Sequence, residues 1–209
     1  MIAYDPTTAL IVVDVQNDFA DPVGSLSVRG AEEILPRINE QIDLAVAASS
    51  VVVYTQDWHP PVTPHFARDG GIWPVHCVAE TWGAALHPGL LVVDDGLRIR
   101  KGVDGEDGFS AFTVRDPVDG EEHGTGLEPQ LRERGVGRAV ICGLATDYCV
   151  RATVLDAVRL GFETILLADA VAAVDLEEDD GERAVGEMRS AGARVELGSS
   201  PRQVDPSGA

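Results

Sequence analysis

Six short apolar runs are spread along the chain, and segments with helical periodicity separate most of them. Most of these runs are nearly continuous in Val, Ile and Leu, as is typical of strands buried on both faces; they cover residues 9–15, 51–55, 97–100, 139–143, 163–168 and 194–197. The helical segments cover residues 31–49, 128–134, 147–160 and 177–191. This alternation predicts an α/β fold in which a parallel sheet carries helices on both faces.

The length and the charge of the chain restrict its organisation and its partners. It has 209 residues without an internal repeat, which predicts one domain over residues 1–209, with residues 198–209 as a surface or mobile tail. Sixteen Lys and Arg face 35 Asp and Glu, a formal net charge of −19. Such a chain repels phosphate backbones and anionic membrane surfaces, so we expect a small-molecule ligand and neither nucleic acid nor membrane as partner.

The cysteine content and the N-terminal segment predict a cytoplasmic protein. Three cysteines, an odd and sparse set, do not form a disulfide framework: Cys77, Cys142 and Cys149. The first residues lack a basic region followed by a long apolar stretch and a cleavage site. No window is apolar over the length needed to span a bilayer.

Polar residues stand at or just beyond the carboxyl ends of four predicted strands. Asp14 is near the end of the first run and Asp57 follows the second. Lys101 follows the run 97–100, and Cys149 lies beyond the run 139–143. Ligands of open parallel sheets bind beyond this edge, so four such residues predict a functional site there.

Cys149 lies where a turn leads into a helix, in the stretch CGLATDYCV. If Thr146 is the N-cap, the sulfur lies near the positive end of the helix dipole, which would lower its pKa. The alternative is a buried cysteine that packs as a small hydrophobe. We expect that second role for Cys77 and Cys142, in a loop core and a buried strand.

Asp14 interrupts an apolar strand, where an isolated carboxylate would be costly. It therefore needs a nearby cation, and Lys101 can supply one. The pair could simply join two strands. Together with Cys149, however, the two residues provide a nucleophile, a base and a charge stabiliser.

The Pro-rich stretch 57–89 contains a set of metal-ligand side chains. Asp57 and His59 lie two residues apart, on the same side of an extended segment, and His65 and His76 follow. A carboxylate with two or three imidazoles suits zinc, and also iron or manganese. Two further histidines lack such neighbours and are predicted to lie at the surface: His87 and His123.

With these residues in place, the chain is similar to the nicotinamidase/pyrazinamidase group of the isochorismatase-like hydrolases. The similar stretches occur in the expected order between residue 9 and about residue 175. They are ALIVVDVQNDF, TQDWHPP, GGIWPVHCVAETWGAALHP, KGVDGEDGFSAF and CGLATDYCVRATVLDAV. The DxH and WPxHC patterns are the most specific, because relatives outside this group generally lack this set of metal-ligand side chains.

The resemblance implies a three-layer αβα sandwich with a six-stranded, mainly parallel sheet. It implies Asp14, Lys101 and Cys149 as a catalytic triad, with the backbone N–H groups of Ala145 and Cys149 as an oxyanion hole. It also implies a cis peptide bond between Leu144 and Ala145.

The resemblance further implies one divalent metal ion, zinc in the first place, with iron or manganese as alternatives. Its ligands would be Asp57, His59 and His76, with His65 at a position that supplies a further ligand in some members. The walls of the substrate pocket would be Phe19, Trp73, Phe109 and Leu144. Relatives often have Tyr in place of Phe109, so this chain keeps the ring and lacks a hydroxyl.

The implied activity is deamidation of nicotinamide to nicotinate and ammonia through a thioester, as a step of NAD salvage, with pyrazinamide as a further substrate. Other hydrolases of the superfamily, of the carbamoyl-amide or ureidoacrylate type, are the nearest alternative. A non-enzymatic binding module using the same sheet edge is an alternative of another class. Association into a homo-oligomer remains open.

Overall fold

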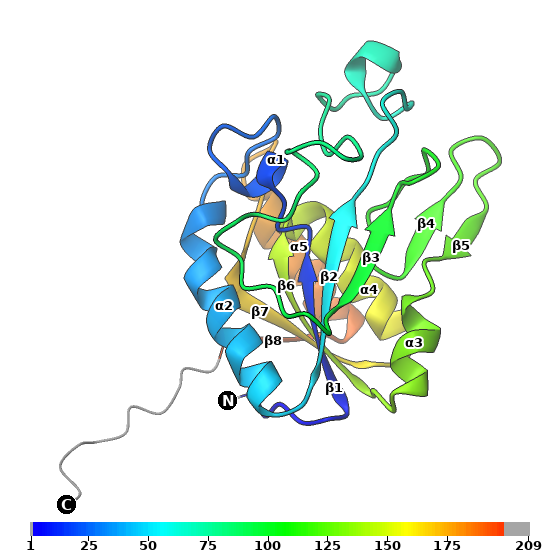
Figure 1. Cartoon of the computed structure of the whole chain (residues 1–209). Helices are drawn as coiled ribbons and strands as arrows, with labels where there is room; N and C mark the ends of the chain where they lie inside the picture. Colours follow the sequence, from blue (N-terminus) through cyan, green and yellow to red (C-terminus); the bar gives the residue numbers. More distant parts are fainter. Residues whose placement is uncertain (1, 199–209) are drawn as a thin grey trace, which may run out of the picture.

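A six-stranded sheet forms the centre of the structure, a computed structural model that describes residues 2–198 (Figure 1). Its strands lie in the order β3-β2-β1-β6-β7-β8, and every neighbouring pair is parallel. Their bounds are β1 (Thr8–Val13), β2 (Val51–Asp57), β3 (Leu97–Lys101), β6 (Arg138–Leu144), β7 (Glu163–Ala172) and β8 (Arg194–Glu196). All six strands predicted from the sequence are therefore present, and the predicted parallel sheet is confirmed.

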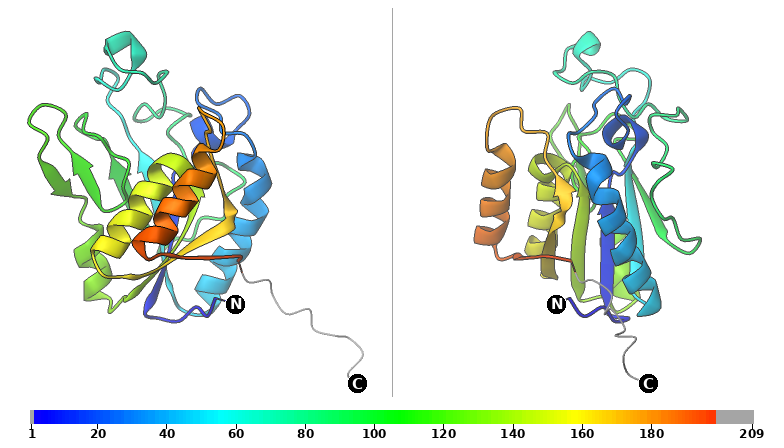
Figure 2. Two further views of the ribbon diagram at one scale, coloured as in Figure 1. Left: turned by 180° about the vertical axis from the view of Figure 1, so that it is seen from behind. Right: turned by 90° about the vertical axis from the view of Figure 1, so that its left-hand side faces the viewer.

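Helices cover both faces of this sheet, which makes three layers (Figure 2). One face carries α2 (Ala31–Ala47). The opposite face carries three helices, namely α3 (Leu127–Glu133), α4 (Arg151–Arg159) and α5 (Asp180–Ala191). The αβα sandwich expected from the sequence is confirmed.

The alternation of side chains along the central strand creates the two cores. Leu10 and Val12 point to one face and pack in the same cluster as Ile38 of α2. Ile11 points to the other face and packs in the cluster that contains Val154 of α4. Successive side chains of a strand point to opposite faces, so a continuous apolar run can serve both layers at once. This explains why the strands carry little polar alternation.

The segment predicted as a helix over 147–160 begins with one wider turn. Residues Thr146–Val150 form a π-helical segment, and α4 follows it directly. The predicted N-cap at Thr146 is wrong, because Ala145 holds that position with an extended backbone. The carbonyl oxygen of Ala145 accepts the N–H of Val150 at 3.1 Å, five residues further on, which widens the turn.

Several short elements were not predicted. They are α1 (Asn17–Ala20), a 3₁₀ turn (Ala67–Asp69), and a hairpin of β4 (Thr113–Arg115) and β5 (Glu122–Gly124). The hairpin is antiparallel and lies beyond β3 in Figure 1. Its strands are only three residues long and largely polar, so no apolar periodicity marks them.

Gly198, the first residue of the predicted tail, is bonded to the domain. Its N–H donates to Asp169 at 2.7 Å, and its carbonyl oxygen accepts from Arg37 at 2.8 Å. The remaining tail, residues 199–209, lies outside the described residues. Among the helices of residues 2–198, each is too short or too polar to cross a bilayer.

We expect Ile38→Ala to lower the free energy of unfolding by about 2–5 kcal/mol, because Ile38 is fully buried between α2 and the sheet. Val46→Ala in the same helix is the matched control. Its side chain is 49% exposed, so the change should be within about 0.5 kcal/mol. Urea unfolding curves of both variants and the parent measure the difference. Equal midpoints for the two variants would contradict the assignment of α2 to the core.

Candidate active site

The carboxyl ends of the central strands bring four chemically active side chains together. Asp14 directly follows β1, and Asp57 and Lys101 are the last residues of β2 and β3. Asp57 and Lys101 are also register partners across the two strands. Cys149 lies in the π-helical turn that follows β6. The parallel sheet therefore places at one edge residues that are far apart in the chain.

The ammonium group of Lys101 is the centre of this group. Lys101 is fully buried, and its Nζ lies 2.7 Å from Asp14 Oδ2 and 2.6 Å from Asp57 Oδ1. It also donates to the carbonyl oxygen of Gly108 at 2.5 Å and lies 3.6 Å from Cys149 Sγ. Burial alone would lower the pKa of Lys101, but the two carboxylates raise it well above its ordinary value. The side chain is therefore a fixed positive charge.

The environment of Asp14 keeps this carboxylate near the balance between its two protonation states. Thr55 donates its hydroxyl to Asp14 Oδ1 at 2.6 Å and accepts the N–H of Asp14 at 3.1 Å. Burial raises the pKa of Asp14 to about 6, while Lys101 and the Thr55 hydrogen bond act to lower it. A carboxyl group with such a pKa can accept and return a proton near neutral pH.

The thiol of Cys149 has a raised pKa, contrary to the expectation of a helix-start thiolate. Burial is the main cause, and the carboxylates of Asp14 and Asp57 add to it against the lowering effect of Lys101. Burial and two nearby carboxylates raise the pKa of the thiol by more than one helix terminus lowers it. The thiol therefore keeps its proton at rest, and Asp14, whose carboxylate lies within 4.8 Å of the sulfur, is placed to receive it.

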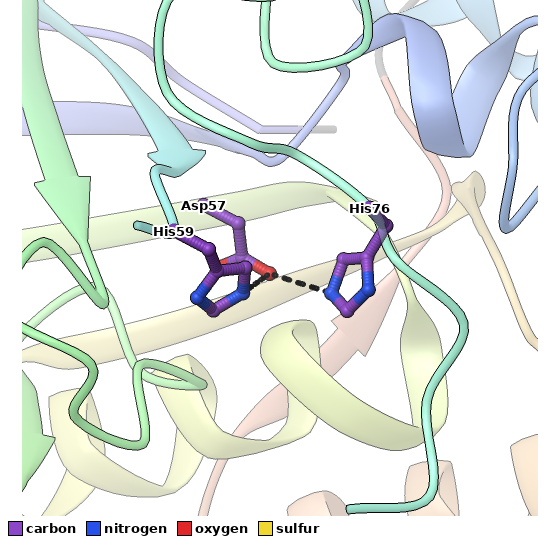
Figure 3. Close-up of side chains that lie close together, drawn as sticks. All are labelled: Asp57, His59 and His76. Atoms are coloured by element: carbon purple, nitrogen blue, oxygen red, sulfur yellow. Dashed lines mark ion pairs between the residues drawn. The ribbon is translucent and has the colours of Figure 1, made fainter. Parts of the chain in front are cut away.

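A second cluster shares Asp57. Asp57 Oδ2 lies 3.7 Å from His59 Nε2 and 4.0 Å from His76 Nε2, between the two rings (Figure 3). His76 Nδ1 is 2.8 Å from the carbonyl oxygen of Pro74, so Nδ1 must donate and Nε2 keeps its lone pair toward Asp57. The potential ligand atoms of the three residues lie within 4.8 Å of one another, and all three side chains are buried.

The charges of this cluster also suit a cation. Burial lowers the pKa of His76, which favours the neutral ring that a metal ion requires. Burial would raise the pKa of Asp57, but Lys101 and the imidazoles hold it below its usual range. One carboxylate and two imidazoles with room for further ligands fit zinc, iron or manganese.

The trio of Asp14, Asp57 and Cys149 is equally close, with ligand atoms within 4.8 Å of one another. The Lys101 ammonium, however, lies within 3.6 Å of an atom of each member. A positive charge already occupies this position. A metal ion would be repelled there, so we assign no metal to this trio.

Aromatic rings wall a pocket that opens above both clusters. The four predicted wall residues all line this pocket, namely Phe19, Trp73, Phe109 and Leu144. His65, Asp107 and Tyr148 line it as well. Tyr148 meets Trp73 edge to face, with ring centroids 5.0 Å apart, and its ring lies 6.1 Å from Phe109. Flat apolar walls above polar groups suit a small aromatic ligand. The bond between Leu144 and Ala145 is cis, as the resemblance implied.

Sequence reasoning missed three supporting residues and misplaced one histidine. The Gln16 side chain bonds both backbone groups of Asp57, donating to its oxygen and accepting from its N–H at 2.8 Å each. Thr55 and Tyr148 were missed as well. His87, predicted at the surface, is buried, and its backbone N–H donates to the carbonyl oxygen of Val15, two residues beyond β1. His123 is exposed as predicted. Gln16 directly follows the apolar run 9–15, and a polar amide at that position was a usable signal.

Comparison with known proteins places this chain in a family. Residues 8–198 match the isochorismatase domain, and the chain belongs to this family. A relative within it is the nicotinamidase/pyrazinamidase of Mycobacterium tuberculosis, 40% identical over 192 residues, which are 90% of this chain and 97% of the relative. The resemblance to the nicotinamidase/pyrazinamidase group is thereby confirmed.

Two solved structures agree closely with the fold. The pyrazinamidase of Pyrococcus horikoshii in complex with zinc superimposes with a TM-score of 0.83 at 41% identity, covering 92% of this chain and 99% of that one. PnC1 from L. infantum in complex with nicotinate also gives 0.83, at 38% identity, covering 94% and 96%. One relative thus binds zinc and another binds a pyridine carboxylate.

We expect Lys101→Met to lower the free energy of unfolding by about 3–5 kcal/mol at neutral pH, because it leaves two buried carboxylates without their cation. Both carboxyl pKa values then lie above their unfolded values, so the loss should shrink as the pH falls and the groups become protonated. Chemical denaturation at several pH values measures this.

Arg151→Met provides the control, because Arg151 is half-exposed and pairs with Glu187 at 2.6 Å on the surface. Its loss should cost less than about 1 kcal/mol at every pH. Similar losses of unfolding free energy in the two variants would show that the buried ion pairs of Lys101 stabilise the fold no more than a surface ion pair does.

Proposed function

We propose that the chain is a nicotinamidase, which converts nicotinamide and water into nicotinate and ammonia with Cys149 as nucleophile. One observation carries the proposal, namely the position of the Lys101 ammonium group. It contacts Asp14 and lies 3.6 Å from the sulfur of Cys149. It also contacts Asp57, which belongs to the cluster with His59. The similarity to nicotinamidases supports it, and the name of the M. tuberculosis relative supports pyrazinamide as a second substrate. The product would feed NAD salvage in the cytoplasm.

In the first half of the reaction, Asp14 accepts the proton of the Cys149 thiol. The thiolate attacks the carboxamide carbon, and the backbone N–H groups of Ala145 and Cys149 hold the oxyanion that develops. The tetrahedral intermediate collapses as the C–N bond breaks, and Asp14 gives its proton to the nitrogen, which leaves as ammonia. Lys101 stabilises the charged forms of both Asp14 and the sulfur throughout, since it is 2.7 Å from one and 3.6 Å from the other.

In the second half, water hydrolyses the thioester. Asp14 takes a proton from the water as it attacks the carbonyl carbon, and the same N–H groups hold the oxyanion again. The C–S bond then breaks, the sulfur recovers its proton from Asp14, and the acid that forms releases its remaining proton to solvent and leaves as nicotinate. Its pyridine ring is held between the walls that Phe19, Trp73 and Phe109 form in the pocket.

Asp57, His59 and His76 would hold a divalent metal ion, which supplies a Lewis-acid site for a ring nitrogen or a water molecule. Zinc is the first candidate, because two imidazoles and a carboxylate are a familiar zinc set, and iron and manganese accept the same ligands. The buried Nδ1–H of His76 on Pro74 fixes the ring for this task.

Amidases of the carbamoyl or ureidoacrylate type are the alternative within the family. The aromatic walls favour a flat heteroaromatic amide over a flexible ureido acid. A panel of nicotinamide, pyrazinamide, a carbamoyl amino acid and ureidoacrylate separates the two. A binding module without activity is disfavoured, because the nucleophile, the proton acceptor and the cation are all present and in contact.

The central experiment measures ammonia release from nicotinamide by the zinc-loaded protein. We expect turnover in the parent, loss of at least about three decades of rate in Cys149→Ala, and loss on chelation with recovery on adding zinc. Cys142→Ala is the matched control, because this buried cysteine lies in the core of β6 away from the pocket. It should keep the parent rate. Turnover of nicotinamide by Cys149→Ala would contradict the assignment of the nucleophile.

We expect Thr55→Val to move the acid limb of the kcat/KM profile to higher pH. The lost hydroxyl stabilises the charged form of Asp14, so without it the carboxyl pKa rises and the base is neutralised at a higher pH. Rates of ammonia release across pH 4–9 measure this, at a temperature where both proteins are folded. Thr55→Ser keeps the hydroxyl and should keep the profile. Identical limbs for the Val and Ser variants would remove Asp14 from the role of base.

A further inference from the structure

His65 connects the two long loops that border the pocket. It lies in the segment between β2 and β3, and its Nε2 is 3.0 Å from the carbonyl oxygens of both Gly105 and Glu106 in the loop after β3. A carbonyl oxygen only accepts, so Nε2 must carry the proton and donate it. The second ring nitrogen, Nδ1, lies 3.1 Å from the carboxylate of Asp107. Both nitrogens therefore face the same three-residue segment.

This arrangement leaves neither nitrogen directed at the metal cluster. A histidine ligand needs a lone pair on a ring nitrogen that points at the ion. Within residues 2–198, the atoms of Asp57, His59 and His76 lie within 4.8 Å of one another, and His65 is not part of that group. It touches the cluster by ring packing instead, with its centroid 5.4 Å from that of His59.

We propose that His65 is a positioning residue, a latch that holds the loop 102–110 against the loop 58–89, in place of the ligand role that the resemblance implied. This inference rests on the proposed function, because it concerns the same metal centre and pocket. It assigns the metal to three protein ligands and gives the fourth histidine a task in shaping the substrate site.

The latched loop carries two groups that the reaction depends on. The carbonyl oxygen of Gly108 accepts from Lys101 at 2.5 Å, and Phe109 stands at the pocket mouth with 38% of its surface exposed. On its other side the loop is bonded to β4, where the N–H groups of Asp107 and Arg115 donate to each other's carbonyl oxygens at 2.8 and 2.9 Å. His65 thus adds a second connection to that of Lys101 on the side of the loop that faces the pocket.

The test compares metal content, loop mobility and kinetics in His65→Ala, Asp107→Ala and His76→Ala. Each protein is loaded with zinc and desalted, and its zinc is measured by mass spectrometry. Hydrogen exchange is then followed in residues 103–109, and KM and kcat are measured with nicotinamide. His123→Ala is the control, because His123 is an exposed histidine of β5 outside the pocket.

We expect His65→Ala to keep the zinc of the parent, whereas His76→Ala loses it. His65→Ala and Asp107→Ala should both exchange faster in residues 103–109, with KM raised roughly three- to thirty-fold and kcat changed less. His65→Gln, whose amide N–H can still donate to the two carbonyls, should restore part of the protection, although an amide is a poor zinc ligand.

Two results would overturn the latch. One is a fall of the zinc content of His65→Ala to that of His76→Ala; the other is parent-like exchange in Asp107→Ala. If circular dichroism shows His65→Ala to be unfolded, His65→Gln takes its place in the zinc comparison. Zinc content and exchange are read without substrate. Failure to hydrolyse nicotinamide would therefore refute the proposed function alone and leave these two readouts to decide the latch.

Discussion

The ion pairs of Lys101 hold together the part of the structure on which the chemistry depends. A buried ammonium group is costly unless it is surrounded by acceptors, and Lys101 has two carboxylates and a carbonyl oxygen within 2.7 Å. These acceptors come from the ends of β1 and β2 and from the loop after β3. Moving any one of these segments would leave a buried charge unpaired. The same contacts that satisfy Lys101 thus align the strand ends.

Asp57 extends this constraint to the second cluster. Its Oδ1 accepts from Lys101, and its Oδ2 faces His59 and His76, so one carboxylate belongs to both groups. Gln16 fixes its backbone on both sides. Burial raises the pKa of Cys149, and the negative charge of the carboxylates of Asp14 and Asp57 adds to this rise against the opposing effect of Lys101. A dication beside Asp57 would offset the negative charge of these carboxylates.

The layers could be predicted from the sequence because apolar runs and helical periodicity report burial directly. The convergence of Asp14, Asp57 and Lys101 followed from the rule that parallel strands end at one edge. The protonation state of Cys149 could not be predicted, because it depends on the summed burial and charge of residues from four segments. Tyr148 was missed for a related reason: it lies beside Cys149 in the sequence, but only the packing of Trp73 against it reveals a pocket wall.

The loop after β3 is rich in Gly and Asp, and two of its glycines are needed for close packing. A Cβ at Gly108 would lie 2.8 Å from the backbone nitrogen of Gly102 and from the Cβ of Lys101, closer than real Cβ atoms approach other atoms. A glycine is required there for the carbonyl oxygen to reach the ammonium of Lys101. A Cβ at Gly102 would likewise lie 2.8 Å from the ring of His59. Glycines suggest flexibility in a sequence, but Gly102 and Gly108 are the residues that let this loop pack closely against both clusters. They contribute to the site because they lack a side chain that would fill the space.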